Sequence, residues 1–407
     1  MIGPLMKNKF IILLCVIVFY LSCSSDGVVK FFEYPDHNVL NIGSQLTDLY
    51  ITNDSNTLIA ADKGNNRVIF IDVSSDAMSI TKRVWVGSEP TSLDMTDDNR
   101  YLFVGLLGGS SVSIINMATM TLEGSLSLQE DSVFDVEYLS SKCQLIVSFI
   151  SGSVNFSKTY VHPWWADQDG VWYGSNNTLC TYAEIPEINI SSQNIYIAEP
   201  PEIDNVLLAG HISVSTNDSL LFVNDKSLNP DRLFRYEITD DGLINEINSN
   251  PTSEHIILLH DLVYIDGFGV VMAIDGTDPS DASPIDHSAV YDIDNLNQKS
   301  NLDVGSVPLA IAYDAVGKHI YISPTDVDDN GMFIIEFSVD TQLQTNYYQV
   351  AGLLGSHTLA VDPKGEYIYA AVDDLSDQDT HEPYNGSSFN IQKIKIISEG
   401  TYPINDF

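Results

Sequence analysis

The sequence feature that most constrains the fold is a 16-residue segment that occurs seven times. The copy "HTLAVDPKGEYIYAAV" from His357 has an alternating apolar run, a polar turn that contains Gly365, and a second apolar run. This pattern is typical of a β-hairpin. Further copies begin at Thr47, Thr91, Phe134, Gly210, His260 and Leu309.

The spacing of the copies predicts the architecture. The starts are separated by 44, 43, 76, 50, 49 and 48 residues, and the one long spacing holds an insertion at about residues 151–206. A period of about 40–50 residues is that of propeller blades. Most copies are followed by a third β-like segment and some by a fourth, which makes the four strands of a blade. The sequence therefore predicts an all-β fold, a seven-bladed β-propeller of four-stranded antiparallel blades.

The two ends of the chain predict how the ring closes. The last copy is followed by one more β-like segment, "FNIQKIKIIS" at 389–398, and then by nine residues, so its fourth strand is missing. The N-terminal "GVVKFFEYP" at 27–35 is β-like and has no blade of its own. If this segment joined the last blade, no sheet edge would stay open. We expect residues 23–407 to form one propeller domain that is closed by an N-terminal strand.

Two of the copies carry a more specific motif. The segments "VGSEPTSLDMTDDNRYLFVG" (86–105) and "VGSVPLAIAYDAVGKHIYIS" (304–323) contain a Gly-x-x-Pro entry, a strand, a turn and a second strand. They resemble the YVTN-type repeat. The resemblance covers most of residues 40–400 but is weak in copies 3, 4 and 5. It implies a seven-bladed propeller, a fold shared by surface-layer proteins, lactonase-like enzymes and propeller lipoproteins.

The N-terminus is typical of an export signal. Lys7 and Lys9 precede an apolar run over residues 10–20, which is followed by "LSCSSDG". A charged start and a short apolar run predict a signal peptide over residues 1–22. Cys23 resembles the lipidated residue of a bacterial lipoprotein, although Tyr20 stands where that motif usually has Leu. We expect a lipoprotein of the bacterial periplasm or cell surface that contacts the membrane through its lipid alone; plain secretion and a retained anchor helix are the alternatives.

The composition is strongly acidic, with 56 Asp and Glu against 18 Lys and Arg and a formal net charge of −38. Phosphate binding requires clustered basic residues, so nucleic acid is excluded as a partner. The acids form either a solvated surface or sites for divalent cations. Asp326, Asp328 and Asn330, with Gly331, match the first half of a calcium loop, so calcium is a candidate cofactor. An ordinary hairpin turn is the alternative for the same residues.

The insertion after the third copy has its own candidate residues. It contains Trp164, Trp165 and Trp172, which either bind a sugar or a protein partner or form a small satellite core. Cys180, also in the insertion, can form a disulfide with Cys143 of the third copy in an oxidising compartment. Two unpaired thiols are the alternative.

Three histidines lie at the start of a repeat copy, where the innermost strand of a blade begins. His260 and His357 occupy the first aligned position and His211 the second, so all three are expected to rim the central channel. Three imidazoles there can bind a ligand or a transition metal. The YVTN resemblance instead implies that such histidines hold neighbouring blades together.

Signatures of common enzymes are missing from the sequence. It has no Gly-x-Ser-x-Gly elbow, phosphate-binding loop, His-Glu-x-x-His helix or dinucleotide fingerprint. We therefore predict a monomeric module that binds a ligand or a protein at the cell envelope, with an envelope protein or a glycan as partner. A lactonase-like hydrolase that uses the central funnel is the alternative, so whether the protein is an enzyme stays open.

Overall fold

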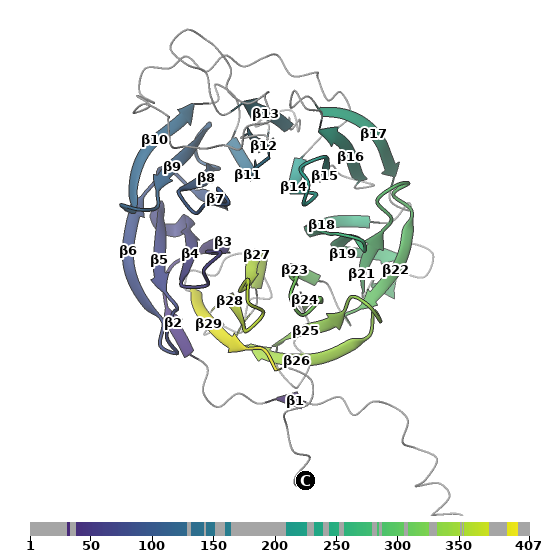
Figure 1. Cartoon of the computed structure of the whole chain (residues 1–407). Helices are drawn as coiled ribbons and strands as arrows, with labels where there is room; N and C mark the ends of the chain where they lie inside the picture. Colours follow the sequence, from purple (N-terminus) through teal and green to yellow (C-terminus); the bar gives the residue numbers. More distant parts are fainter. Residues whose placement is uncertain are drawn as a thin grey trace, which may run out of the picture.

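The computed structural model shows a ring of antiparallel sheets around a central axis (Figure 1). In each sheet the strands lie further from the axis in chain order, except that two N-terminal strands lie on the outer edges of the last two sheets. The described residues are 31–32, 38–127, 132–141, 144–150, 159–163, 209–225, 232–238, 244–251, 256–278, 283–284, 287–304, 308–324, 332–350, 352, 354–373 and 389–397.

The sheets follow one another around the ring in chain order. The first holds β3 (Leu46–Ile51), β4 (Thr57–Asp62), β5 (Arg67–Asp72) and β6 (Ser79–Trp85), with the short helix η1 (Lys63–Asn65) after β4. The second holds β7 (Pro90–Met95), β8 (Tyr101–Leu106), β9 (Ser111–Asn116) and β10 (Thr121–Ser127). The third holds β11 (Ser132–Leu139), β12 (Gln144–Ile150) and β13 (Thr159–Pro163).

The other sheets complete the circle. The fourth holds β14 (Ala209–Val214), β15 (Leu220–Asp225), β16 (Arg232–Ile238) and β17 (Ile244–Pro251). The fifth holds β18 (Ile256–Ile265), β19 (Gly269–Asp278), β21 (His287–Tyr291) and β22 (Gln298–Asp303), with the short β20 (Ser283–Pro284) beside β19. The sixth holds β23 (Pro308–Asp314), β24 (His319–Pro324), β25 (Met332–Ser338), β26 (Gln344–Val350) and β1 (Phe31–Phe32). The last holds β27 (Leu354–Val361), β28 (Tyr367–Asp373), β29 (Phe389–Lys395) and β2 (Asn38–Asn41).

The prediction of an all-β propeller with four-stranded antiparallel blades is confirmed. The prediction of seven such blades is not confirmed. Six sheets have at least four strands, and the third sheet has three among the described residues. The chain that follows β13, from residue 164 to 208, lies outside those residues. The structure therefore shows six complete blades and one three-stranded sheet between the second and fourth of the ring.

The N-terminal strand beside β29 is not the predicted segment. β2 pairs with β29 in antiparallel register, with Leu40 opposite Ile391. Of the predicted segment 27–35, the structure describes β1, which pairs in parallel with β26 of the sixth sheet. The reason is packing: Leu40 and Ile42 contact the apolar core between the last and first sheets, and the chain then leads directly into β3.

The repeated hairpin of the sequence has the same turn geometry in four of its seven copies. In these four, the ninth residue of the repeated segment has a positive φ, between 53° and 67°. Its amide N–H donates to the carbonyl oxygen three residues earlier, at 2.8 Å each time. These residues are Ser55, Asn99, Asp218 and Gly365. Polar residues and glycine tolerate this left-handed conformation best, which explains the polar turn in each copy.

The core lies between the sheets. Each apolar cluster of the described residues joins two neighbouring sheets; Phe70 and Val104, for example, belong to one cluster of the first and second sheets. Tyr369 and Leu58 belong to the cluster that joins the last sheet to the first. Burying such aliphatic or aromatic side chains contributes about 1.5–3 kcal/mol each. Because both faces of a blade are covered, the middle strands are apolar on both sides, as in β4, where residues 58–61 are apolar and all buried. Within the part of the chain that is described, no helix has the length and apolar character needed to cross a membrane.

Candidate functional site

Side-chain oxygens on the innermost strands connect the first six sheets, each to the next. A carboxylate or hydroxyl oxygen near the axis accepts a hydrogen bond from a backbone N–H of the following inner strand. The acceptor and donor pairs are Asp48 and Leu93 (2.6 Å), Asp94 and Tyr138, Asp135 and Ile212 (3.0 Å), Ser213 and Tyr264 (3.1 Å), and Asp261 and Ile311 (3.0 Å). Where the acceptor is an ionised carboxylate, as Asp261 is, the hydrogen bond is charge-assisted and stronger than a neutral one. They fix the inner strands as a rigid frame around the channel.

The inner strand of the last sheet departs from this regular frame. In its ladder with β28, Leu354 pairs with Val372 and Leu359 with Ala370, so residues 355–358 form a bulge. His357 lies within the bulge and has φ +56°. A bulge redirects side chains, and a positive φ in a residue other than glycine is a strained conformation. The strand thereby directs the His357 side chain toward the channel.

His357 meets His211 and two of the buried acids. Its Nε2 lies 2.8 Å from Asp261 Oδ1, and its ring stacks on that of His211 with centroids 3.7 Å apart. His211 Nδ1 lies 3.4 Å from Asp135 Oδ2. The four side chains, Asp135, His211, Asp261 and His357, are here named the central His cluster. Because β14 and β27 face one another across the middle of the ring (Figure 1), this cluster spans the channel.

The surrounding charges set the protonation of this cluster. Burial alone would lower the pKa of His357, but the carboxylates of Asp261 and Asp135 raise it to about 10. Conversely, burial would raise the pKa of Asp261, and His357 beside it holds this pKa below its usual range. At neutral pH the pair is therefore an imidazolium and a carboxylate.

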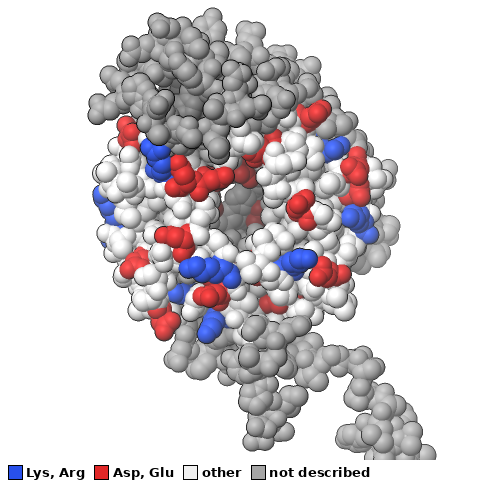
Figure 2. Space-filling view, viewed as in Figure 1, with Lys and Arg blue, Asp and Glu red and all other residues white. Residues whose placement is uncertain are grey.

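Burial dominates at three other acids near the axis. It raises the pKa of Asp94 to about 7, and it raises the pKa values of Asp48 and Glu137 well above their ordinary range. The field of Asp135 adds to each of these shifts. Figure 2 shows the hollow at the centre of one face, with acidic side chains along its border. The channel thus carries more potential negative charge than its histidines balance.

The structure brings together two of the three predicted histidines. His211 and His357 are in contact, as expected for residues that rim one channel. His260 lies on β18, directly before Asp261, and its side chain is outside the described residues. Sequence reasoning missed Asp135 and Asp261. An alignment of the repeat copies could have identified them, because both acids occupy the same aligned position as His211.

The other predicted site residues fall outside the described residues, so the structure leaves those predictions as they were. They are the aromatic residues Trp164, Trp165 and Trp172, the lipidation site Cys23, the disulfide pair Cys143 and Cys180, and the calcium-loop residues Asp326, Asp328 and Asn330.

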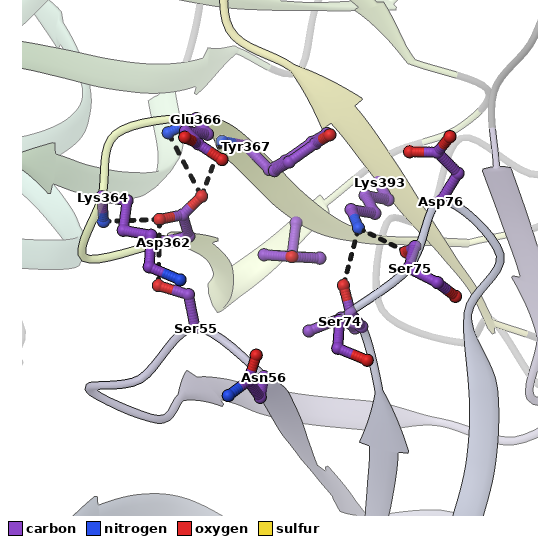
Figure 3. Close-up of a pocket in the computed structure, with 12 residues that line it drawn as sticks. Ser55, Asn56, Ser74, Ser75, Asp76, Asp362, Lys364, Glu366, Tyr367 and Lys393 are labelled. Atoms are coloured by element: carbon purple, nitrogen blue, oxygen red, sulfur yellow. Dashed lines mark hydrogen bonds between the residues drawn. The ribbon is translucent and has the colours of Figure 1, made fainter.

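A second hollow, of about 410 Å³, lies between the last and first sheets (Figure 3). Lys393 of β29 donates from Nζ to the carbonyl oxygens of Val73 (2.7 Å) and Ser75 (2.8 Å) in the first sheet's outer loop. On the other side of the hollow, the Ser55 hydroxyl donates to Asp362 Oδ1 at 3.2 Å. These bonds join the two ends of the ring, so we interpret this hollow as a structural joint.

Comparison with known proteins supports the fold. No protein-family model matches the chain, and no curated protein matches its sequence. Among solved structures, Kuenenia stuttgartiensis hydrazine synthase is similar, with a TM-score of 0.58 and 15% identity over 91% of this chain and 98% of that one. A chain of the mitotic checkpoint complex has a TM-score of 0.60 and 13% identity, covering 92% of this chain and 96% of that chain. The Cps50 (Swd1) β-propeller domain of Myceliophteria thermophila has a TM-score of 0.57 and 11% identity, covering 89% and 100%.

The fold and these similarities define the chain as a β-propeller protein. At such low identities they establish the fold alone. Because no family model matches, membership of the specific YVTN-repeat family stays a prediction.

Proposed function

We propose that this protein is an exported, lipid-anchored β-propeller that binds a ligand or a protein at the cell envelope, with a small-ligand site at the central His cluster. The observation that carries the binding role is the strained His357. A left-handed residue costs about 1–3 kcal/mol, and such strain gathers at sites where a side chain must be held for function. Here it places an imidazole beside His211 in a rigid polar channel, which is the preorganisation that binding requires.

The proposal also includes a closed seven-bladed ring. We take the three-stranded sheet β11–β13 as a seventh blade, since its inner strand continues the sheet-to-sheet bonds through Asp94 and Asp135. We also take β2 as the strand that closes the ring, and the protein as a monomer, because a closed ring leaves no blade edge to pair with another copy. The YVTN-type repeat is the proposed family, on the motifs at 86–105 and 304–323.

The proposed anchor is tested at Cys23. When the full chain is expressed with its own leader in a bacterium, we expect its N-terminal peptide to begin at Cys23 and to carry acyl chains by mass spectrometry. Cys23→Ser should abolish the acylation and move the protein from the membrane to the soluble fraction. Two or more chains are expected, because one alone gives only marginal membrane binding. An unmodified N-terminus downstream of Cys23 in the wild type would refute the anchor.

The proposed ligand site is tested by thermal shift against a defined panel of sugars, amino acids, short peptides and lactones. A saturating ligand is expected to raise the melting temperature by about 5 °C. His357→Asn should remove this shift without disturbing the backbone, because Asn tolerates a positive φ. His319→Asn is the matched control, since His319 lies on β24 outside the cluster.

The thermal-shift result can contradict the proposal in two ways. A shift of equal size in wild type and His357→Asn would place the ligand elsewhere on the ring. The absence of a shift with every member of the panel would exclude a small-molecule site of this kind. Partner binding at Trp164, Trp165 and Trp172 is a separate proposal from the sequence and does not depend on either outcome.

A lactonase-like hydrolase is the second candidate function. The observation that favours it is the His357 and Asp261 pair, 2.8 Å apart, since an imidazolium held by a carboxylate can stabilise the negative charge that develops on the carbonyl oxygen when water attacks a lactone. A hydrolase should consume a lactone from the panel, measured as acid release at constant pH, and should lose turnover in Asp261→Asn. A module that only binds should shift in melting temperature with no acid release.

A further inference from the structure

We propose that Asp135, His211 and His357 bind one divalent transition-metal ion at the centre of the ring. The inference rests on the proposed function only in placing the ligand at the central His cluster. It names the chemical class of that ligand as an ion with the preferences of Zn²⁺, which a binding module can use to hold a further molecule.

The spacing of the donor atoms is close to that of a metal site. One ligand atom from each of Asp135, His211 and His357 can be chosen so that all three lie within 4.8 Å of one another. His211 Nδ1 and Asp135 Oδ2 are 3.4 Å apart. In a tetrahedral zinc site with bonds of about 2.0–2.1 Å, neighbouring donors are about 3.4 Å apart. One pair of donors already has this separation, and in the set within 4.8 Å no pair has to close by more than about 1.4 Å. Because the two imidazole rings are stacked, one of them must also rotate for both nitrogen lone pairs to point at one ion.

The donor types select the ion. Two imidazoles and one carboxylate suit zinc and iron(II), whereas calcium and magnesium prefer sites made of oxygen alone. Three protein ligands leave the fourth tetrahedral position open for water or for an organic ligand. The arrangement is therefore that of an open site and differs from the closed sites that only stabilise a fold.

Asp261 orients one of the metal ligands. It lies 2.8 Å from His357 Nε2, so this nitrogen carries the proton and Nδ1 is the nitrogen left for the metal. The other oxygen of Asp261 accepts the Ile311 N–H at 3.0 Å, which fixes the carboxylate in turn. A carboxylate that holds a histidine in this way is the usual outer partner of a metal ligand. Asp261 is thus a positioning residue.

The charge around the cluster also favours a cation. Asp48, Asp94 and Glu137 lie close enough to the cluster for their fields to act on one another or on His357. A divalent ion would balance this excess of acid more fully than one protonated histidine does. The competing interpretation is that protonated His357 alone balances the acids, in an ion cluster that only stabilises the ring. The two interpretations differ in whether the protein binds a metal.

The test is titration of the full chain, freed of metals with EDTA, with ZnCl₂ by calorimetry and with CoCl₂ by visible absorption. The titrations are made with excess Mg²⁺ in the buffer, so that Mg²⁺ and not the added Zn²⁺ or Co²⁺ occupies the exposed carboxylates of this acidic surface. We expect one ion per chain with a micromolar or tighter Kd, and a tetrahedral Co²⁺ spectrum. Asp135→Asn and His357→Asn should each weaken binding at least ~100-fold, and His319→Asn should leave it unchanged.

The variants are chosen to fold. In Asp135→Asn the amide oxygen of the new side chain can still accept the Ile212 N–H, and Asn tolerates the positive φ at position 357. A thermal melt of each variant without metal verifies folding. Asp261→Asn should retain one ion per chain but bind it about 10–100-fold more weakly and shift the Co²⁺ absorption band, an effect that a merely structural role would not produce.

Two results would overturn the metal site. One is the failure of wild type to bind Zn²⁺ or Co²⁺ at one ion per chain. The other is binding that persists in the double variant of Asp135→Asn and His357→Asn, which would place the ion among surface acids. If either occurs while a panel ligand still shifts the melting temperature in a His357-dependent way, the metal inference fails and the binding function stands. If zinc binds and no panel ligand does, the metal inference stands and the small-molecule function fails.

Discussion

A chain that lacks residues 1–41 is expected to melt about 4–8 °C below a chain that lacks residues 1–37. The first truncation removes β2 and the second keeps it, so the pair isolates this strand; neither has the leader. β2 supplies four register pairs with β29 and brings Leu40 onto the core between the last and first sheets. Burial of that leucine and the lost ladder bonds together contribute about 3–4 kcal/mol, and each kcal/mol is worth about 1.5–2 °C in a protein of this size.

The shorter chain is also expected to associate. Without β2, the N–H and C=O groups of β29 form an open strand edge, which is a template for pairing with another copy. Size-exclusion chromatography should therefore show oligomers or aggregates for the truncation at 41 and a single species for the truncation at 37. If both chains melt at the same temperature and stay monomeric, β2 does not close the ring and the N-terminus is dispensable for its stability.

This strand also shows where sequence reasoning reaches its limit. The repeat period predicted the sheets, and the polar turns predicted the left-handed hairpin residues such as Asn99 and Gly365. The pairing of the N-terminus was assigned to the wrong residues, because both 27–35 and 38–41 are β-like and a short pattern does not specify its partner. Packing of Leu40 and Ile42 against the core decides between them, and no local pattern contains that information.

The candidate site was predictable to a similar degree. The repeat register alone indicated that His211 and His357 would rim one channel, and in the structure their rings stack on one another. It could have indicated Asp135 and Asp261 as well, because they share a repeat position with His211. The bulge could not be predicted: "GSHT" at 355–358 gives no sign that the ladder with β28 is interrupted there, although this interruption directs the imidazole to the centre.

The stability of the protein is expected to fall as pH rises from about 6.5 to 10. His357 has its pKa raised to about 10 by Asp261 and Asp135, whereas in the unfolded chain it has its ordinary value of 6.5. A raised pKa means that the folded state holds the proton more tightly, so its contribution is complete below 6.5 and is lost on the way to 10. We expect a loss of up to about 5 kcal/mol, measured from urea unfolding midpoints at successive pH values.

Substitution of the histidine tests the source of this pH dependence. In His357→Asn the loss between pH 6.5 and 10 should shrink to less than half, whereas His319→Asn should keep it. Asp94 acts with the same sign at lower pH: its pKa is raised by burial to about 7, so its contribution is lost between about 4 and 7 and should persist in both variants. A metal ion at the cluster would displace the proton of His357, so added Zn²⁺ should flatten the alkaline part of the wild-type profile as the substitution does. An alkaline loss unchanged in His357→Asn would show that other groups cause it and that the His357 and Asp261 pair is not the ion pair that stabilises the channel.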